Sequence, residues 1–98
     1  MNGFVIFLFL FLASYGQTGV IKGIVKKIDG KKISDVYIYN NEGKGTFTDS
    51  KGRFTLVLDS GKHTLFFEHT SYLLKEFSIV VRKNKFTTVK IILTCKKL

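Results

Sequence analysis

The chain has 98 residues, one cysteine, no proline and a formal net charge of +9 at pH 7. A chain of this length has room for one small domain, and a single cysteine excludes an internal disulfide framework. A positive net charge favours binding of nucleic acid, anionic lipid or an acidic polysaccharide. The lysines are scattered along the sequence, however, which is more typical of solvated strand edges than of one basic block.

An apolar run, FVIFLFLFLA at residues 4–13, opens the chain. It is shorter than the ~20 residues that a helix needs to cross a bilayer, and the small residues Ser14 and Gly16 suit cleavage after Gly16. We therefore expect a signal peptide at residues 1–16, export, and a mature domain at residues 17–98 without a transmembrane segment. An uncleaved anchor and a buried N-terminal strand are the alternatives, because no lysine or arginine precedes the run.

The rest of the chain is typical of an all-β domain. Short runs of β-branched and aromatic residues alternate with clusters of Gly, Asn, Asp and Lys, while helical periodicity is weak. Such even spacing predicts a seven-stranded antiparallel β-sandwich of two sheets. The basic segment 82–85 is expected to form a hairpin between the last two strands. The predicted strands are residues 20–28, 34–40, 46–48, 53–58, 63–69, 72–81 and 86–94.

Within these runs alternate residues are apolar, which is the period of a strand with one buried face. In the second strand Val36 and Ile38 are expected to face the core, while Tyr37 and Tyr39 face the other way. In the fifth strand Phe66 is expected to face outward or sideways. The other residues expected on the core side are Ile21, Gly23, Val25, Phe54, Leu56, Leu58, Leu65 and Phe67.

The segment TDSKGRF at residues 48–54 predicts a tight turn between two strands. Asp49 can accept hydrogen bonds from backbone N–H groups two residues on, and Gly52 can supply the positive φ that closes the turn. Asp49 does not indicate a calcium loop, because Lys51 stands where a further carboxylate would be needed. Turn capping is therefore the expected role of Asp49.

The outward aromatic residues Tyr37, Tyr39 and Phe47 predict an exposed patch near Lys22 and Lys26. Such a surface suits sugar rings or a partner strand. Packing against a neighbouring domain is the alternative. Nucleic acid would use the same aromatic and basic residues, but a signal peptide removes the chain from most nucleic acid, so we expect no nucleic-acid partner.

Residue types that carry catalysis do not form a convincing site. His63 and His69 are six apart on one predicted strand, which separates them by about 20 Å and excludes one shared metal. Ser71, His69 and Asp49 could be grouped as a triad, but no nucleophile elbow or oxyanion loop frames any serine. We expect no catalytic residue, no metal site and no cofactor.

These residues resemble the carboxypeptidase regulatory-like domain, a β-sandwich of the transthyretin (prealbumin) type that is common in exported proteins of the Bacteroidetes. The resemblance runs from about Ile21 to Leu93 and is strongest in GTFTDSKGRFTL at residues 45–56. The chain departs from the family at Ser71, where a glycine before tyrosine is expected. The positions that carry the family motif are Gly23, Gly45, Thr48, Asp49, Gly52, Phe54, Leu56 and Tyr72.

The resemblance implies a noncatalytic role, because this family occurs as an accessory module beside peptidases and at the N-terminus of TonB-dependent outer-membrane receptors. We therefore expect an exported accessory or interaction module of the cell envelope, periplasmic, outer-membrane associated or secreted, with a protein or glycan partner. The alternatives are the N-terminal fragment of a TonB-dependent receptor for nutrient uptake and the accessory domain of a separately encoded peptidase.

Overall fold

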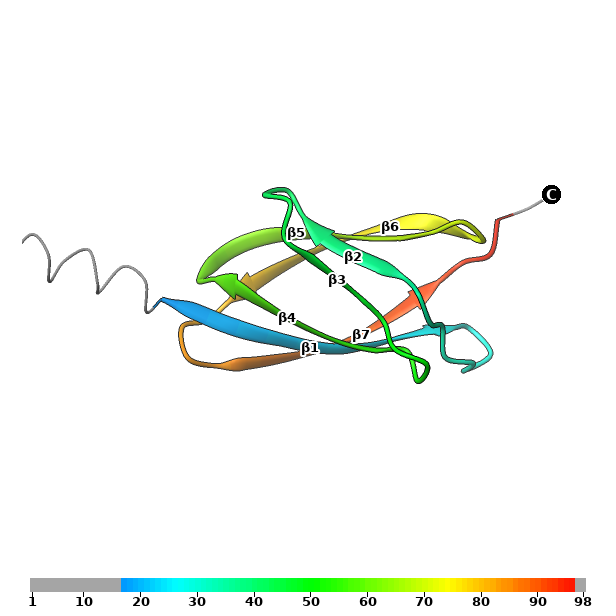
Figure 1. Cartoon of the computed structure of the whole chain (residues 1–98), viewed down its shortest axis with the longest axis horizontal. Coiled ribbons are helices and arrows are strands. Elements are labelled where there is room, and N and C mark those ends of the chain that lie inside the picture. The colour runs from blue at the N-terminus through cyan, green and yellow to red at the C-terminus, as the bar shows by residue number, and fades with distance from the viewer. Residues whose placement is uncertain (1–16, 97–98) are drawn as a thin grey trace, which may run out of the picture.

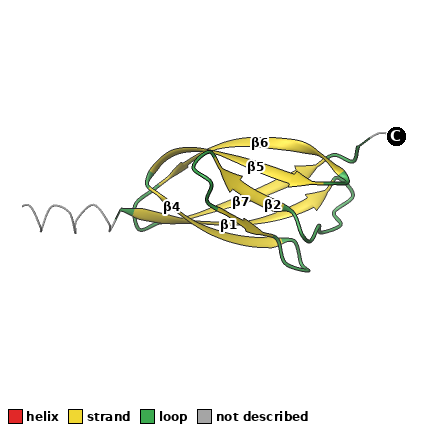
Figure 2. Ribbon diagram, turned by 45° about the horizontal axis from the view of Figure 1, so that its top comes forward, coloured by secondary structure: helices red, strands yellow, loops and turns green. Residues whose placement is uncertain are grey.

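The computed structural model describes residues 17–96, so the expected signal peptide lies outside the described residues. The described chain folds as two layers of β-strands (Figure 1; Figure 2). Within residues 17–96 no helix is long and apolar enough to cross a membrane. The strands are β1 (Thr18–Lys27), β2 (Tyr37–Asn40), β3 (Gly45–Phe47), β4 (Arg53–Asp59), β5 (Gly61–His69), β6 (Tyr72–Val81) and β7 (Phe86–Leu93).

One layer is a three-stranded sheet with the order β4-β1-β7, and the other is a four-stranded sheet with the order β3-β2-β5-β6. The predicted seven-stranded β-sandwich is confirmed. One pair departs from the antiparallel expectation, since β1 and β7 run parallel, from Val20 opposite Phe86 to Lys27 opposite Leu93. The four other strand pairs within the two sheets are antiparallel. The first and last strands of the domain therefore lie side by side.

The predicted hairpin at residues 82–85 is wrong. β6 pairs with β5 in one sheet and β7 pairs with β1 in the other, so this turn carries the chain between the sheets. The Asn84 N–H donates to the Thr18 carbonyl at 2.8 Å, and the Val20 N–H donates to the Lys85 carbonyl at 3.0 Å, which ties the turn to β1. The turn residues correctly predicted a reversal, but the choice of partner strand depends on β1, which is distant in sequence.

The core lies between the two sheets and consists of the inward rows of their strands. Phe54 and Phe67 meet edge to face across it, with ring centroids 5.8 Å apart. Gly23 faces the same space, and a Cβ there would lie 2.6 Å from Phe54 Cζ and 2.7 Å from Val89 Cγ2. The buried apolar residues are Ile21, Val25, Ile33, Val36, Ile38, Phe54, Leu56, Leu58, Leu65, Phe67, Ile79, Val81, Ile91 and Leu93.

Replacing Phe54 by alanine tests this packing. Phe54→Ala should lower the free energy of unfolding by about 3–5 kcal/mol, because it empties the space above Gly23 and removes the contact with Phe67. A core of this size supplies only about 3–5 kcal/mol net, so the variant should be largely unfolded in circular dichroism melts. Val57→Ala, on the outward face of the same strand, is the control. An unchanged melting curve for Phe54→Ala would contradict the assignment.

Candidate functional site

Four aromatic side chains lie in a row on the outer face of the four-stranded sheet. We call Phe47, Tyr37, Tyr39 and Phe66 the aromatic strip. The Tyr37 ring centroid is 4.9 Å from that of Phe47 and 4.9 Å from that of Tyr39, and the Tyr39 and Phe66 centroids are 5.2 Å apart. The strip therefore crosses from the edge strand β3 over β2 to β5.

Local alternation explains why these rings face outward. Val36, Ile38 and Asn40 are buried, so Tyr37 and Tyr39, which alternate with them, project to the opposite side of the strand. The register then places Tyr37 opposite Phe47 on β3 and Tyr39 opposite Phe66 on β5. The sequence placed Phe66 on an outward face but did not include it in the patch, because its neighbour on β2 depends on the strand register.

Two carboxylates border the aromatic strip. The Tyr39 hydroxyl donates a hydrogen bond to Glu68 Oε1 at 3.0 Å, and this bond raises the pKa of Tyr39 above its ordinary value. Glu76 on β6 is opposite Phe66, the last ring of the strip. The surface thus combines aromatic faces with hydrogen-bond acceptors, which suits the rings and hydroxyls of a sugar or the side chains of a protein.

The predicted closeness of the patch to two lysines is only partly met. Lys22 and Phe47 line one shallow surface pocket, together with Gly23 and Asp49 among others. Lys26 is not among the residues that line it. Both lysines belong to β1, which lies in the three-stranded sheet, whereas the aromatic strip lies on the four-stranded sheet. The lysines and the strip therefore occupy different layers.

The turn after β3 is held by Asp49. Its Oδ1 accepts hydrogen bonds from the backbone N–H groups of Lys51 and Arg53, both at 2.9 Å, and its Oδ2 lies 3.8 Å from Arg53 Nε. The bond from the Arg53 N–H, and then that from Lys51, lower the pKa of the Asp49 carboxyl. Gly52 closes the turn with a φ of 74°, where a Cβ would also lie 2.6 Å from the Val25 carbonyl oxygen.

The remaining motif positions have structural contacts. Thr48 is buried, and its hydroxyl donates to the Ile33 carbonyl at 2.8 Å and accepts from the Val36 N–H at 3.0 Å. A Cβ on Gly45 would lie 2.8 Å from Tyr37 Cε1, so this glycine makes room for a ring of the aromatic strip. Leu56 is in the core, and Tyr72 is partly buried and packs against the core cluster.

The two histidines are each engaged in local contacts. His63 is buried, with Nε2 2.7 Å from the Asp59 carbonyl oxygen and Nδ1 3.5 Å from Asn40 Nδ2. His69 meets the Tyr72 ring edge to face at 5.1 Å, and its Nδ1 accepts the Ser71 N–H at 3.1 Å. Among residues 17–96 no three His, Cys, Asp or Glu side chains lie close enough to hold a metal ion.

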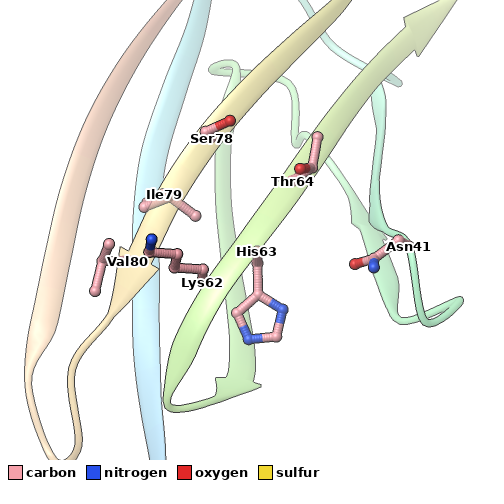
Figure 3. Close-up of a pocket in the computed structure, with 7 residues that line it drawn as sticks. All are labelled: Asn41, Lys62, His63, Thr64, Ser78, Ile79 and Val80. Carbon is pink, nitrogen blue, oxygen red and sulfur yellow. The ribbon is translucent and has the colours of Figure 1, made fainter.

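Figure 3 shows the shallow pocket that His63 lines, between β5, β6 and the loop after β2. The Nε2 atom is within hydrogen-bond reach of a carbonyl, so it donates there, which leaves Nδ1 to accept from the Asn40 amide. Asn40 in turn accepts the N–H groups of Glu42 and Lys44 through Oδ1. Both ring nitrogens therefore serve a structural network that fixes the loop after β2. The other lining residues are Asn41, Lys62, Thr64, Ser78, Ile79 and Val80.

The Asp49 turn makes stability depend on pH. The folded-state pKa of Asp49 lies below its ordinary value of 3.8, so its hydrogen bonds stabilise the fold above that value and are lost as the pH falls through the folded pKa. In urea titrations, wild type should be more stable than Asp49→Asn at neutral pH, and the difference should shrink in acid. Asp35→Asn removes a carboxylate outside this turn and is the control. A difference that stays constant with pH would refute the assignment.

The fold occurs in proteins of very different kinds. The minor pilin GBS52 of Streptococcus agalactiae is similar over 84% of this chain and 46% of its own, with a TM-score of 0.66 and 20% identity. 3-Chlorocatechol 1,2-dioxygenase of Rhodococcus opacus 1CP is similar over 83% of this chain and 61% of its own, with a TM-score of 0.64 and 13% identity. A DUF3823 family protein of Parabacteroides merdae is similar over 82% of this chain and 47% of its own, with a TM-score of 0.59 and 17% identity. The chain spans less than two thirds of each, and these likenesses show the fold alone.

Sequence comparison identifies the family. A search of curated proteins finds no match. A family model described as the CarboxypepD_reg-like domain matches residues 21–98, which is most of the chain and includes all seven motif positions from Gly45 to Tyr72 as well as Gly23. Together with the two-layered β-sandwich described above, this match shows that the chain belongs to the CarboxypepD_reg-like domain family.

Proposed function

We propose that this domain is a noncatalytic, exported accessory module of the cell envelope that binds a protein or glycan partner through the aromatic strip. Family membership supports the accessory role. The observation that carries the proposal is the strip itself, in which four neighbouring rings lie on one outer face beside the Tyr39–Glu68 hydrogen bond. Phe47 at one end is 61% exposed, which leaves ring surface available to a partner.

Two features support a binding role over a catalytic one. Both histidines have local partners, and the Asp49 carboxylate is occupied by the turn that it caps. The aromatic strip, in contrast, has hydrogen-bond acceptors at its border and rings of the type enriched in the energetic centres of interfaces.

A second candidate places the domain within a larger assembly. The chain spans only 46% of the GBS52 pilin and 17% of the Bacillus anthracis TIE protein, so sandwiches of this shape occur as parts of longer chains. In this second candidate, the domain is either the N-terminal part of a TonB-dependent outer-membrane receptor or an accessory domain that stabilises a separately encoded peptidase. In either case the aromatic strip would pack against the neighbouring protein.

The size and location of the native product separate these candidates. For a stand-alone exported module, an antibody raised against residues 17–98 should detect a product of about 9 kDa, the mass of those residues, in the periplasm or medium of fractionated source cells. A much larger product in the outer-membrane fraction would instead support the receptor. A product confined to the cytosol would contradict export.

Loss of the rings tests the binding surface. The double variant Tyr39→Ala/Phe66→Ala should reduce recovery of envelope partners on immobilised protein by tenfold or more, because central aromatic anchors commonly contribute about 2 kcal/mol or more each. Ser78→Ala/Val80→Ala shortens outward side chains of β6, in the same sheet but outside the strip, and is the matched control. Recovered proteins are identified by mass spectrometry, and glycans by array binding. Equal recovery by both double variants would exclude the strip as the binding surface.

A further inference from the structure

The outer face of the three-stranded sheet carries a second, different surface. Residues that are opposite each other in register share one face of a sheet, so the pairings of β1 with β4 and β7 define its outer rows. The row through Lys22 contains Thr55 and Thr88, and the row through Ile24 contains Arg53 and Lys90. The next outward residue of β1 is Lys26, opposite Ile92. We call Lys22, Lys26, Arg53 and Lys90 the basic face.

Charge is distributed unequally between the two outer faces. The basic face has four cations, and the outward carboxylate of its strands is Asp59, at the far end of β4. Arg53 also has an exposed ion pair with Asp49 at 3.8 Å. The outer rows of β5 and β6 in the four-stranded sheet have more negative than positive charge, because they carry Glu68 and Glu76 but one lysine, Lys62.

The basic segment between β6 and β7 extends this surface. Arg82, Lys83 and Lys85 are all exposed, and the segment is fastened to β1 by the hydrogen bond from the Val20 N–H to the Lys85 carbonyl. It leads directly into Phe86, the first outward residue of β7. Cations therefore continue from the sheet face around this end of the sandwich, where Figure 1 shows β7 beside β1.

Apolar side chains are exposed among these cations. Phe86 is 69% exposed, Val57 is 51% exposed, and both are opposite Val20 in the same outer row. Lys22 Nζ lies 4.9 Å from the centre of the Phe86 ring. Ile92 is exposed at the other end of β7. Lysines beside exposed apolar and aromatic groups fit a lipid interface, where the cations meet phosphates and the apolar groups enter the headgroup region.

We propose that the basic face docks the domain on a membrane surface rich in anionic phospholipids. A polysaccharide or nucleic acid would meet the cations and stack on Phe86, but it would leave the exposed aliphatic side chains of Val57 and Ile92 without a use. Because the two outer faces lie on opposite layers of the sandwich, a domain docked in this way presents Tyr37, Tyr39 and Phe66 away from the bilayer, while Phe47 lies at the edge where the strip meets Lys22. The proposal does not depend on the identity of the partner that the strip binds.

Vesicle binding of the full chain tests the charge requirement. The chain is cosedimented with phosphatidylcholine–phosphatidylglycerol vesicles and, separately, with vesicles of phosphatidylcholine alone. The quantity measured is the difference in bound protein, which we call the anionic excess, because insertion of apolar groups into the bilayer contributes to both values and is subtracted. Lys22→Gln/Lys90→Gln should lower the anionic partition coefficient by about 30-fold, since each lysine near such a surface contributes about fivefold. Added salt should lower it as well. Lys44→Gln/Lys62→Gln, which removes equal charge elsewhere, is the control and should retain most of the excess.

A fluorescent label tests which face meets the lipid, whatever else anchors the chain. In a Cys95→Ser background, Thr88→Cys places an environment-sensitive dye on the basic face, and Ser78→Cys places it on the outer face of β6. Anionic vesicles should shift the fluorescence emission of the dye at residue 88 to shorter wavelength and leave the emission of the dye at residue 78 unchanged. Both positions are exposed on edge strands, so their labelling is comparable.

Three results would overturn the proposal. One is the absence of any anionic excess together with an unshifted dye at residue 88. Another is an equal loss of binding in the two lysine double variants, which would mean that net charge alone acts. The third is salt-resistant binding to a sulfated polysaccharide with no response to vesicles. Phe86→Ser should weaken vesicle binding without changing the melting curve, because this ring is mostly exposed.

Discussion

Two connections that cross between the sheets, from β1 to β2 and from β3 to β4, are joined by one buried hydroxyl, that of Thr48. It donates to the Ile33 carbonyl and accepts from the Val36 N–H, which fixes the loop that leaves β1 and enters β2. Four residues later the Gly52 carbonyl accepts the Val25 N–H of β1 at 2.8 Å. The connection from β3 to β4 is thereby fastened to both layers. Without the hydroxyl, a buried carbonyl and amide would lose partners at a cost of about 1–3 kcal/mol each.

This clamp also explains why the motif around residues 48–54 combines such different residue types. The threonine supplies a group that is both donor and acceptor, the aspartate satisfies the N–H groups of the turn, and Gly52 supplies the positive φ. Gly52 must also be small, because its backbone lies against Val25. Each residue has a packing or hydrogen-bonding task, so the motif is accounted for by structure alone.

Once the sheets are fixed, strand alternation produces two outer faces of different chemistry. The inward residues of each strand form one apolar core, and the residues that alternate with them lie on the outer faces of the sheets. On β2 these are the tyrosines of the aromatic strip, and on β1 they include Lys22 and Lys26. A net charge of +9 therefore does not describe the whole surface: the layer with the aromatic strip has carboxylates at its border, while the other layer has the four cations of the basic face.

Local sequence determined the strands, the Asp49 turn and the outward position of Tyr37 and Tyr39, because alternation and turn formation depend on residues within a few positions of one another. The tertiary structure decided the parallel pairing of β1 with β7, the crossing of segment 82–85 between sheets, the addition of Phe66 to the aromatic strip, and the gathering of scattered cations on one face. These features join residues far apart in the chain, such as Val20 and Phe86, and their register is set by how whole strands pack over the common core, which no local pattern encodes.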